Sequence, residues 1–95
     1  MESYKKELVS IISKHLPERT IFLYGSRARG TQLSCADIDL AIDNQGKRVD
    51  LATWGMMLLD TDDSGVTVPI DVVDINTSSQ EFINEIKKDW KVWKS

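Results

Sequence analysis

Hydrophobic residues recur along the first half of the chain at two different spacings. Residues 2–16 carry apolar side chains at helical spacing, and Pro17 ends that pattern. Residues 20–24 (T-I-F-L-Y) and 37–42 (D-I-D-L-A-I) are short β-prone runs. Between them, residues 25–30 suit a turn followed by a short helix, with loop as far as the second run. The pattern therefore predicts a helix, a strand, a short helix and a second strand.

The middle of the chain is denser in apolar residues. Residues 48–60 hold them at too many positions for a one-sided helix. We therefore expect a helix that packs on more than one side, with Gly55 as a point of close approach. A loop follows over residues 60–65. Residues 66–75 then have the character of a third strand, with Pro69 near its start, where a missing N–H is tolerated best.

The C-terminal segment predicts one more helix. Ser78 or Ser79 suits the N-cap position, because a hydroxyl there accepts a hydrogen bond from the first helical turn. Apolar residues follow at helical spacing, at Phe82, Ile83, Ile86, Trp90 and Trp93. The order α-β-α-β-α-β-α predicts an α/β (α+β) fold in which helices flank a small mixed sheet of about three to four strands.

Composition narrows the class of protein. Ninety-five residues suffice for a single domain over residues 1–95, and 41% hydrophobic with 28% charged residues is typical of a globular chain. A net charge of −3 argues against stable binding of nucleic acid, which needs clustered Lys and Arg. The single Cys35 excludes an intramolecular disulfide. No apolar run approaches the ~18 residues of a membrane span, so we expect a cytoplasmic protein without membrane contact.

Two acids dominate the second strand. Side chains two residues apart on a strand face the same side, so Asp37 and Asp39 project together while Ile38 faces away. Paired carboxylates repel unless a cation lies between them, and oxygen-only ligands suit magnesium. The alternative interpretation is an exposed strand edge that carries two solvated acids.

A third acid lies in the otherwise apolar third strand. An unpaired buried carboxylate is costly, so Asp71 needs a partner or a function. Asp74 lies three residues further on and faces the opposite side of a regular strand. Only one of the two can therefore join Asp37 and Asp39. We assign Asp71 to that face and expect Asp74 to cap the turn after the strand.

The turn after the first strand has features of an anion site. Gly25 lets backbone approach an anion closely, and the N–H groups that open the next helix point toward it. Ser26 adds a hydroxyl donor. Arg27 and Arg29 lie where a guanidinium could reach the same anion, although a solvated helix face explains both equally well. A Gly-Ser turn taken alone is more often only a turn.

Taken together, these features resemble a known superfamily. Gly25-Ser26, ten residues and then Asp37-x-Asp39, with a third acid on a later strand, look like the signature of DNA polymerase beta-like nucleotidyltransferases. The run Y-G-S-R-A-R-G-T and the strand D-I-D-L-A-I are most similar to its minimal nucleotidyltransferase (MNT) branch. The resemblance covers residues 20–93. Ala36 departs from it, because those proteins usually carry Ser or Thr there, which puts catalytic efficiency in doubt but removes no metal ligand.

The resemblance implies a nucleotidyltransferase fold and a magnesium-dependent reaction with two ions. Asp37 and Asp39 would hold one Mg²⁺ bridged to the triphosphate, and together with Asp71 a second one that binds the acceptor hydroxyl. The residues implied for the triphosphate are Gly25, Ser26, Arg27 and Arg29. ATP is the donor expected from the family, since the sequence shows no base pocket.

The resemblance also implies a partner. Many minimal nucleotidyltransferases are encoded beside a helical HEPN-domain protein, so the expected acceptor is a tyrosine of such a protein, modified with AMP in an antitoxin mechanism. The alternative is a catalytically weak or inactive antitoxin that restrains its partner by binding alone. Three acids kept together favour the enzyme. The oligomeric state stays open, a homodimer included, and Trp90 and Trp93 are candidates for an interface.

Overall fold

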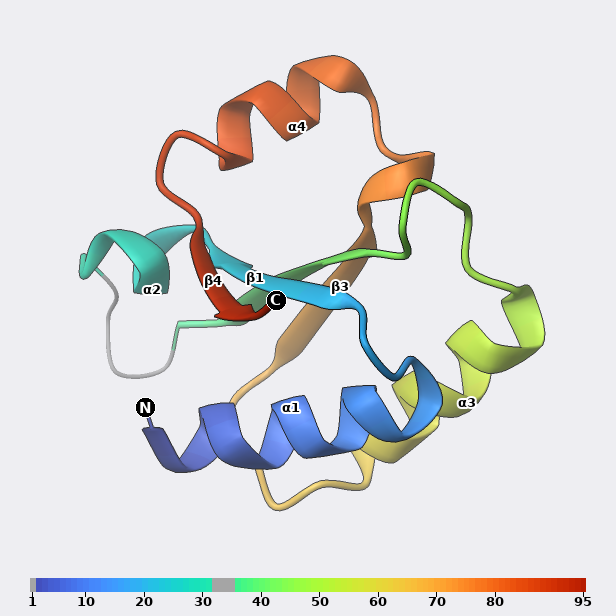
Figure 1. The fold of residues 1–95 in the computed structure, drawn as a ribbon. Coiled ribbons are helices and arrows are strands. Elements are labelled where there is room, and N and C mark those ends of the chain that lie inside the picture. The colour runs from blue at the N-terminus through green and yellow to red at the C-terminus, as the bar shows by residue number, and fades with distance from the viewer. Residues whose placement is uncertain (1, 32–35) are drawn as a thin grey trace.

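Four strands form one mixed sheet with helices on both faces (Figure 1). The structure is a computed structural model that describes residues 2–31 and 36–95. Its elements are α1 (Glu2–His15), β1 (Thr20–Tyr24), α2 (Ser26–Arg29), β2 (Ile38–Asp43), α3 (Leu51–Asp62), β3 (Ile70–Asp74), the 3₁₀ turn η1 (Ile75–Thr77), α4 (Gln80–Ile86) and β4 (Lys91–Lys94). The predicted α/β fold class is confirmed. Cys35 and the rest of residues 32–35 lie outside the described residues.

The strand order β3-β2-β1-β4 fixes which residues meet across the sheet. β1 pairs antiparallel with β2 and β4, while β2 pairs parallel with β3 through the crossover helix α3. The registers set Tyr24 opposite Asp39, and Asp39 opposite Asp71. Three strands thus bring their side chains to one place on the sheet.

Alternation along β2 sorts its side chains onto two faces. Ile38, Leu40 and Ile42 are fully buried in the core that α1 and α3 cover. Ala41 faces the other way and packs in a smaller cluster with Ile86 of α4, and by the same alternation Asp39 shares its face. In Figure 1 α1 and α3 lie below the sheet and α4 above it. Among the described residues, no helix has the length and apolar character needed to cross a membrane.

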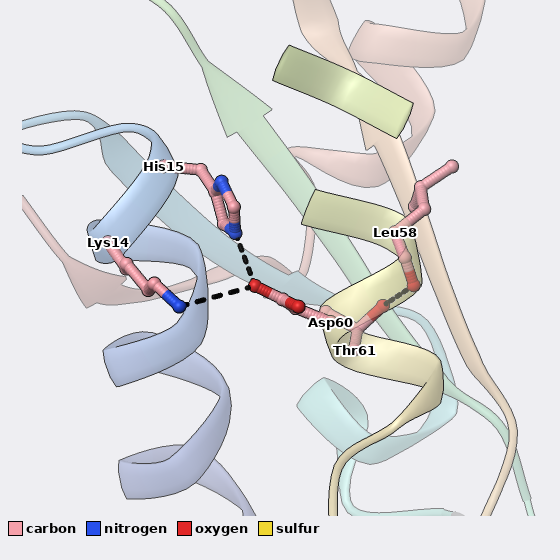
Figure 2. Close-up of polar contacts among 5 residues, drawn as sticks. All are labelled: Lys14, His15, Leu58, Asp60 and Thr61. Atoms are coloured by element: carbon pink, nitrogen blue, oxygen red, sulfur yellow. Dashed lines mark hydrogen bonds and ion pairs between the residues drawn. The ribbon is translucent and has the colours of Figure 1, made fainter. Parts of the chain in front are cut away.

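Polar contacts join α1 and α3 at one end (Figure 2). His15 Nε2 lies 2.5 Å from Asp60 Oδ2, and Lys14 Nζ lies 3.7 Å from the same oxygen. The Thr61 hydroxyl donates to the Leu58 carbonyl within α3, at 2.8 Å. The His15 hydrogen bond, and less strongly Lys14, hold the pKa of Asp60 below its usual value. His15 therefore has a structural role, because it connects the end of α1 to α3.

The limits of two elements differ from those predicted. α3 begins at Leu51 because the Asp50 side chain caps it, accepting a hydrogen bond from Thr53 N at 3.1 Å, and it continues to Asp62. β3 spans only Ile70–Asp74, within the longer strand predicted over residues 66–75.

The expectation that the third helix packs on several sides is wrong. Met57 and Thr61 are the buried residues of α3, and the apolar residues on its outer side are exposed. A Cβ at Gly55 would meet no atom within 4 Å, so Gly55 is not a point of close approach inside the chain. The apolar density that predicted two-sided packing is real, but the chain itself covers only one side.

The predicted last helix is wrong in its second half. Ser79 caps α4 by accepting a hydrogen bond from Phe82 N at 3.1 Å, but the helix ends at Ile86. The chain then turns, and β4 pairs with β1. Trp90 stacks on Phe22 of β1, with ring centroids 3.8 Å apart. The spacing of Trp90 and Trp93 fits a helix, but residues 91–94 pair with the open edge of β1 and form a strand instead.

Candidate active site

The parallel strands β2 and β3 bring two of the predicted acids side by side. Asp39 and Asp71 are register partners, so their side chains leave the same face of strands about 4.8 Å apart. Asp39 is half-buried and Asp71 is exposed. Asp37 stands one residue before β2 and is also exposed. The site thus combines one sheltered carboxylate with two that reach solvent.

Asp39 is electrostatically strained by its neighbours. Its pKa is raised, first by burial and then by the negative charges of Asp71 and Asp37. The positive charges of Arg27 and Arg29 act in the opposite direction without cancelling the effect. Because the charges of Asp71 and Asp37 both act on Asp39, a cation beside Asp39 would relieve this repulsion.

Asp74 has a structural role on the opposite side of β3. It is buried, its Oδ2 accepts a hydrogen bond from Val49 N at 2.9 Å, and its Oδ1 accepts one from Asn76 N at 2.9 Å. Both carboxylate oxygens therefore accept hydrogen bonds from backbone N–H groups. The structure separates the two acids of β3 as strand alternation predicts, while the catalytic role of Asp71 stays a prediction.

Gly25 lies against Asp39 at the end of β1. Its φ is 76°, in the region that favours glycine, and a Cβ there would lie 2.5 Å from Asp39 Oδ2. Ser26 opens α2, and within residues 2–31 and 36–95 its hydroxyl has no hydrogen-bond partner. Glycine is therefore required here by the close approach of the Asp39 carboxylate, and the Ser26 hydroxyl is available beside that acid.

Both arginines already interact within the chain. Arg27 donates to the Ala36 carbonyl from Nε and Nη2, at 3.1 and 2.7 Å, and from Nε to the Asp37 carbonyl at 3.3 Å. Arg29 forms an ion pair with Asp89, with Nη1 and Oδ2 3.6 Å apart. Arg27 thus ties α2 to the segment that leads into β2 and so positions Asp37. A contact of either arginine with a triphosphate stays a prediction.

Tyr24 belongs to the same place and was missed from the sequence. It is buried opposite Asp39, and burial, with Asp39 and Asp71 next, raises its pKa to about 12. Its ring packs edge-on against Phe82, with centroids 5.8 Å apart. The phenol therefore stays protonated near the acids. Its position directly before Gly25 was the available signal.

The acids suit a divalent metal ion, although they do not form a closed cage. Nucleotidyltransferases of this fold generally use divalent metals, and carboxylate oxygens are the ligands that hard cations prefer. In the part of the chain that the structure describes, no three His, Cys, Asp or Glu side chains converge closely enough to form a complete site. Mg²⁺ tolerates this, because it keeps several waters and takes further ligands from substrate phosphates. The donor set therefore fits, with the substrate expected to complete it.

One family of known enzymes matches nearly the whole chain. Residues 6–94 match the family described as "Polymerase beta, Nucleotidyltransferase". The chain therefore belongs to the polymerase beta nucleotidyltransferase family, as its motifs implied. Its enzyme class is nucleotidyltransferase.

Solved structures show the same fold at low sequence identity. A toxin–antitoxin structure with AMP-PNP has a TM-score of 0.80 at 20% identity, covering 96% of this chain and 73% of that chain. The tri-AMPylated HEPN toxin of Shewanella oneidensis in complex with an MNT antitoxin gives 0.76 at 16%, covering 99% and 71%. A putative nucleotidyltransferase from Sulfolobus solfataricus gives 0.57 at 22%, covering 96% and 76%. No curated protein matches this sequence.

Proposed function

We propose that this chain is an antitoxin that transfers AMP from ATP to a hydroxyl of a helical HEPN-type partner, with Mg²⁺ as cofactor. The observation that carries the proposal is the pairing of Asp39 with Asp71 beside the Gly25 turn. The AMP-PNP complex and the AMPylated HEPN toxin, both from structures with this fold, support the donor and the acceptor. We assign the reaction to the cytoplasm, where nucleoside triphosphate is available.

The triphosphate would bind at the turn between β1 and α2. Gly25 allows backbone N–H groups to approach an anion closely, and the Ser26 hydroxyl is available as a further donor. Arg27 and Arg29 add positive potential at this place, because both lower the pKa of the adjacent Asp39. The two arginines would therefore favour triphosphate binding even while they keep their partners in the chain.

Asp37, Asp39 and Asp71 would hold the magnesium ions. Bound there, Mg²⁺ would neutralise phosphate charge and lower the pKa of the acceptor hydroxyl. The acceptor oxygen attacks the α-phosphorus, the bond from that phosphorus to the bridging oxygen breaks, and pyrophosphate leaves. Asp71 is the candidate to accept the hydroxyl proton, since its carboxylate is exposed where an acceptor would approach.

A protein acceptor suits this chain better than a nucleic acid. The chain carries a net charge of −3, so it lacks the excess of Lys and Arg that neutralises many phosphates. An exposed tyrosine on a helical partner needs only one hydroxyl to enter the site. Addition of AMP would then bring bulk and negative charge to the active surface of the toxin.

A second candidate function is restraint of the partner by binding alone. One observation favours it: Ala36 stands where the family usually has a Ser or Thr hydroxyl. Against it stands the cost of keeping mutually repelling acids together, which a binding module has no reason to retain.

One experiment separates the two functions. The purified chain is incubated with its HEPN-type partner, Mg²⁺ and each labelled nucleoside triphosphate, and every protein is then weighed by mass spectrometry. We expect the partner to gain AMP units only with ATP and Mg²⁺, and not with the Asp39→Asn protein. If the partner stays unmodified and is still silenced stoichiometrically by Asp39→Asn, restraint by binding is the function.

A further inference from the structure

The outer face of α3 is apolar at every exposed position between its start and Leu59. These positions are Leu51, Ala52, Gly55, Met56 and Leu59. Leu51, Met56 and Leu59 expose 70%, 56% and 63% of their surface. The neighbouring α1 instead presents Lys6, Ser10 and Lys14 to solvent. Since a helix on a core normally turns polar residues outward, an apolar outer face marks a contact surface.

The two ends of α3 carry exposed charges of opposite sign. Lys47 and Arg48 precede the helix, while Asp62 and Asp63 stand at its end. None of these four forms an ion pair with any residue of the described ranges. Asp50 caps the start as the helix dipole favours, but the last turn holds acids where the dipole favours bases. A partner with the reverse arrangement would satisfy both ends together.

We propose that α3 pairs with α3 of a second copy of this chain, antiparallel about a two-fold axis near Gly55. The antiparallel arrangement brings the basic start of each helix to the acidic end of the other. One surface is then its own complement, as a two-fold dimer requires. Leu51 and Leu59 each lie four residues from Gly55, so Leu51 of one copy faces Leu59 of the other. Gly55 lets the helices approach closely, because no side chain stands between them.

Hollows beside the two ends of α3 fit this arrangement. One of about 310 Å³ has a mixed lining that includes Leu51 and Trp54 together with Arg48 and Thr77, and its apolar part would receive Leu59 of the second copy. The other, of about 400 Å³, is lined by Leu59, Asp60, Asp62 and Asp63, and it would receive the Arg48 guanidinium of the second copy. A helix of 12 residues spans about 18 Å, so the contact is smaller than a standard interface and the dimer is weak.

The dimer would leave the acids free. α3 covers the sheet face that carries Leu40, whereas Asp39 lies on the face of α4. Self-association and nucleotidyl transfer are therefore separate properties, and either can fail without the other.

Sedimentation equilibrium of the full chain tests the dimer, over protein concentrations from about 1 µM to about 1 mM. We expect a reversible monomer–dimer equilibrium that weakens as salt is raised, since ion pairs contribute to it. A chain that stays monomeric over this range contradicts the proposal. In that case a different protein, and not a second copy, would be the one that covers α3.

Charge reversal tests the antiparallel geometry. Arg48→Asp and Asp62→Arg should each weaken self-association by about tenfold or more, because each creates two like-charge contacts in the dimer. An equal mixture of the two variants should associate again, since each copy supplies the charge that the other has lost. Misfolded variants would not associate when they are mixed, so restored association cannot result from damage to folding. A mixture that remains monomeric overturns the antiparallel pairing.

Gly55→Leu tests the crossing point. The substitution removes a glycine from a helix interior, so the melting temperature of the monomer should rise. The new side chain would hold the helices apart, so the dimer should be lost. Ser10→Leu on the outer side of α1 is the matched control and should leave self-association unchanged. A Gly55→Leu protein that dimerises like the parent chain places the interface elsewhere.

Discussion

Toward α1 and α3 the strand β2 presents Ile38, Leu40 and Ile42, all fully buried, whereas toward α4 it presents Ala41 and the half-buried Asp39. Neighbouring residues of β2 thus face opposite sides, one buried in the apolar core and one carrying the candidate acid. The difference arises because α1 and α3 together close over one face, while α4 spans only seven residues and packs on Ala41 rather than over Asp39.

The comparison has an energetic side. The apolar face supplies the favourable burial that holds the sheet together. The acid face works against folding, because burial, and then the negative charges of Asp71 and Asp37, raise the pKa of Asp39. Substitutions on the two faces should therefore have opposite signatures: loss of stability on one, and loss of transfer with an intact fold on the other.

Asp39→Asn should show the largest effect. We expect the transfer rate to fall by more than about 10³-fold, since the loss of even one charge-stabilising donor from an active site costs about 10²–10³. The melting temperature should stay the same or rise, because repulsion among the acids is relieved. Mass spectrometry of the partner measures transfer and thermal unfolding measures stability. A well-folded double variant of Asp37 and Asp39 with full activity would disprove the metal-dependent mechanism.

Asp71 and Asp74 extend the comparison to β3. Asp71→Asn should lose transfer and keep its stability. Asp74→Asn should do the reverse, because an amide offers only one acceptor oxygen for Val49 N and Asn76 N, at a cost of about 1–3 kcal/mol. Urea unfolding and partner modification are measured on both proteins. An inactive but stable Asp74→Asn would show that the acids of β3 are assigned the wrong way round.

Leu40→Ala tests the apolar face directly. Leu40 is fully buried next to Asp39, and truncation should lower the free energy of unfolding by about 2–5 kcal/mol. Transfer per folded molecule should not change. Val92→Ala on β4, where Val92 is 53% exposed, is the control and should stay within about 0.5 kcal/mol. Similar losses for the two variants would mean that the burial of this face contributes little.

Strand alternation follows from covalent geometry, so the sequence could predict that Asp71 and Asp74 face opposite sides. The choice of Asp71 rests on its apolar neighbours on both sides, and its place beside Asp39 depends on the long-range register of β2 with β3. The hydrogen bonds of Arg27 to the Ala36 and Asp37 carbonyls could not be predicted in this way. They depend on how the chain returns to β2, which no local pattern contains.

Two errors in the fold have a common cause. The spacing of Trp90 and Trp93 predicted a helix, but pairing with the distant β1 makes residues 91–94 a strand. The apolar density of α3 predicted packing on several sides, but Leu51, Met56 and Leu59 are exposed in the folded chain. In both cases the prediction used a local pattern, whereas the contact depends on the arrangement of the whole fold.

Asp60→Asn should show the smallest effect, and it sharpens the comparison because the pKa of Asp60 is shifted opposite to that of Asp39. Mainly through its hydrogen bond with His15, and then through Lys14, the folded-state pKa of Asp60 lies below 3.8. A lowered folded-state pKa adds stability above the unfolded-state pKa, and that stability is lost as pH falls through the folded-state value.

The parent chain should therefore melt at a slightly higher temperature than Asp60→Asn at about pH 6, and this difference in melting temperature, the gap, should close as the pH falls below 3.8. Thermal unfolding across this range measures the gap, which salt should also narrow. A gap that stays constant down to about pH 2 would mean that the ionised carboxylate is not its source.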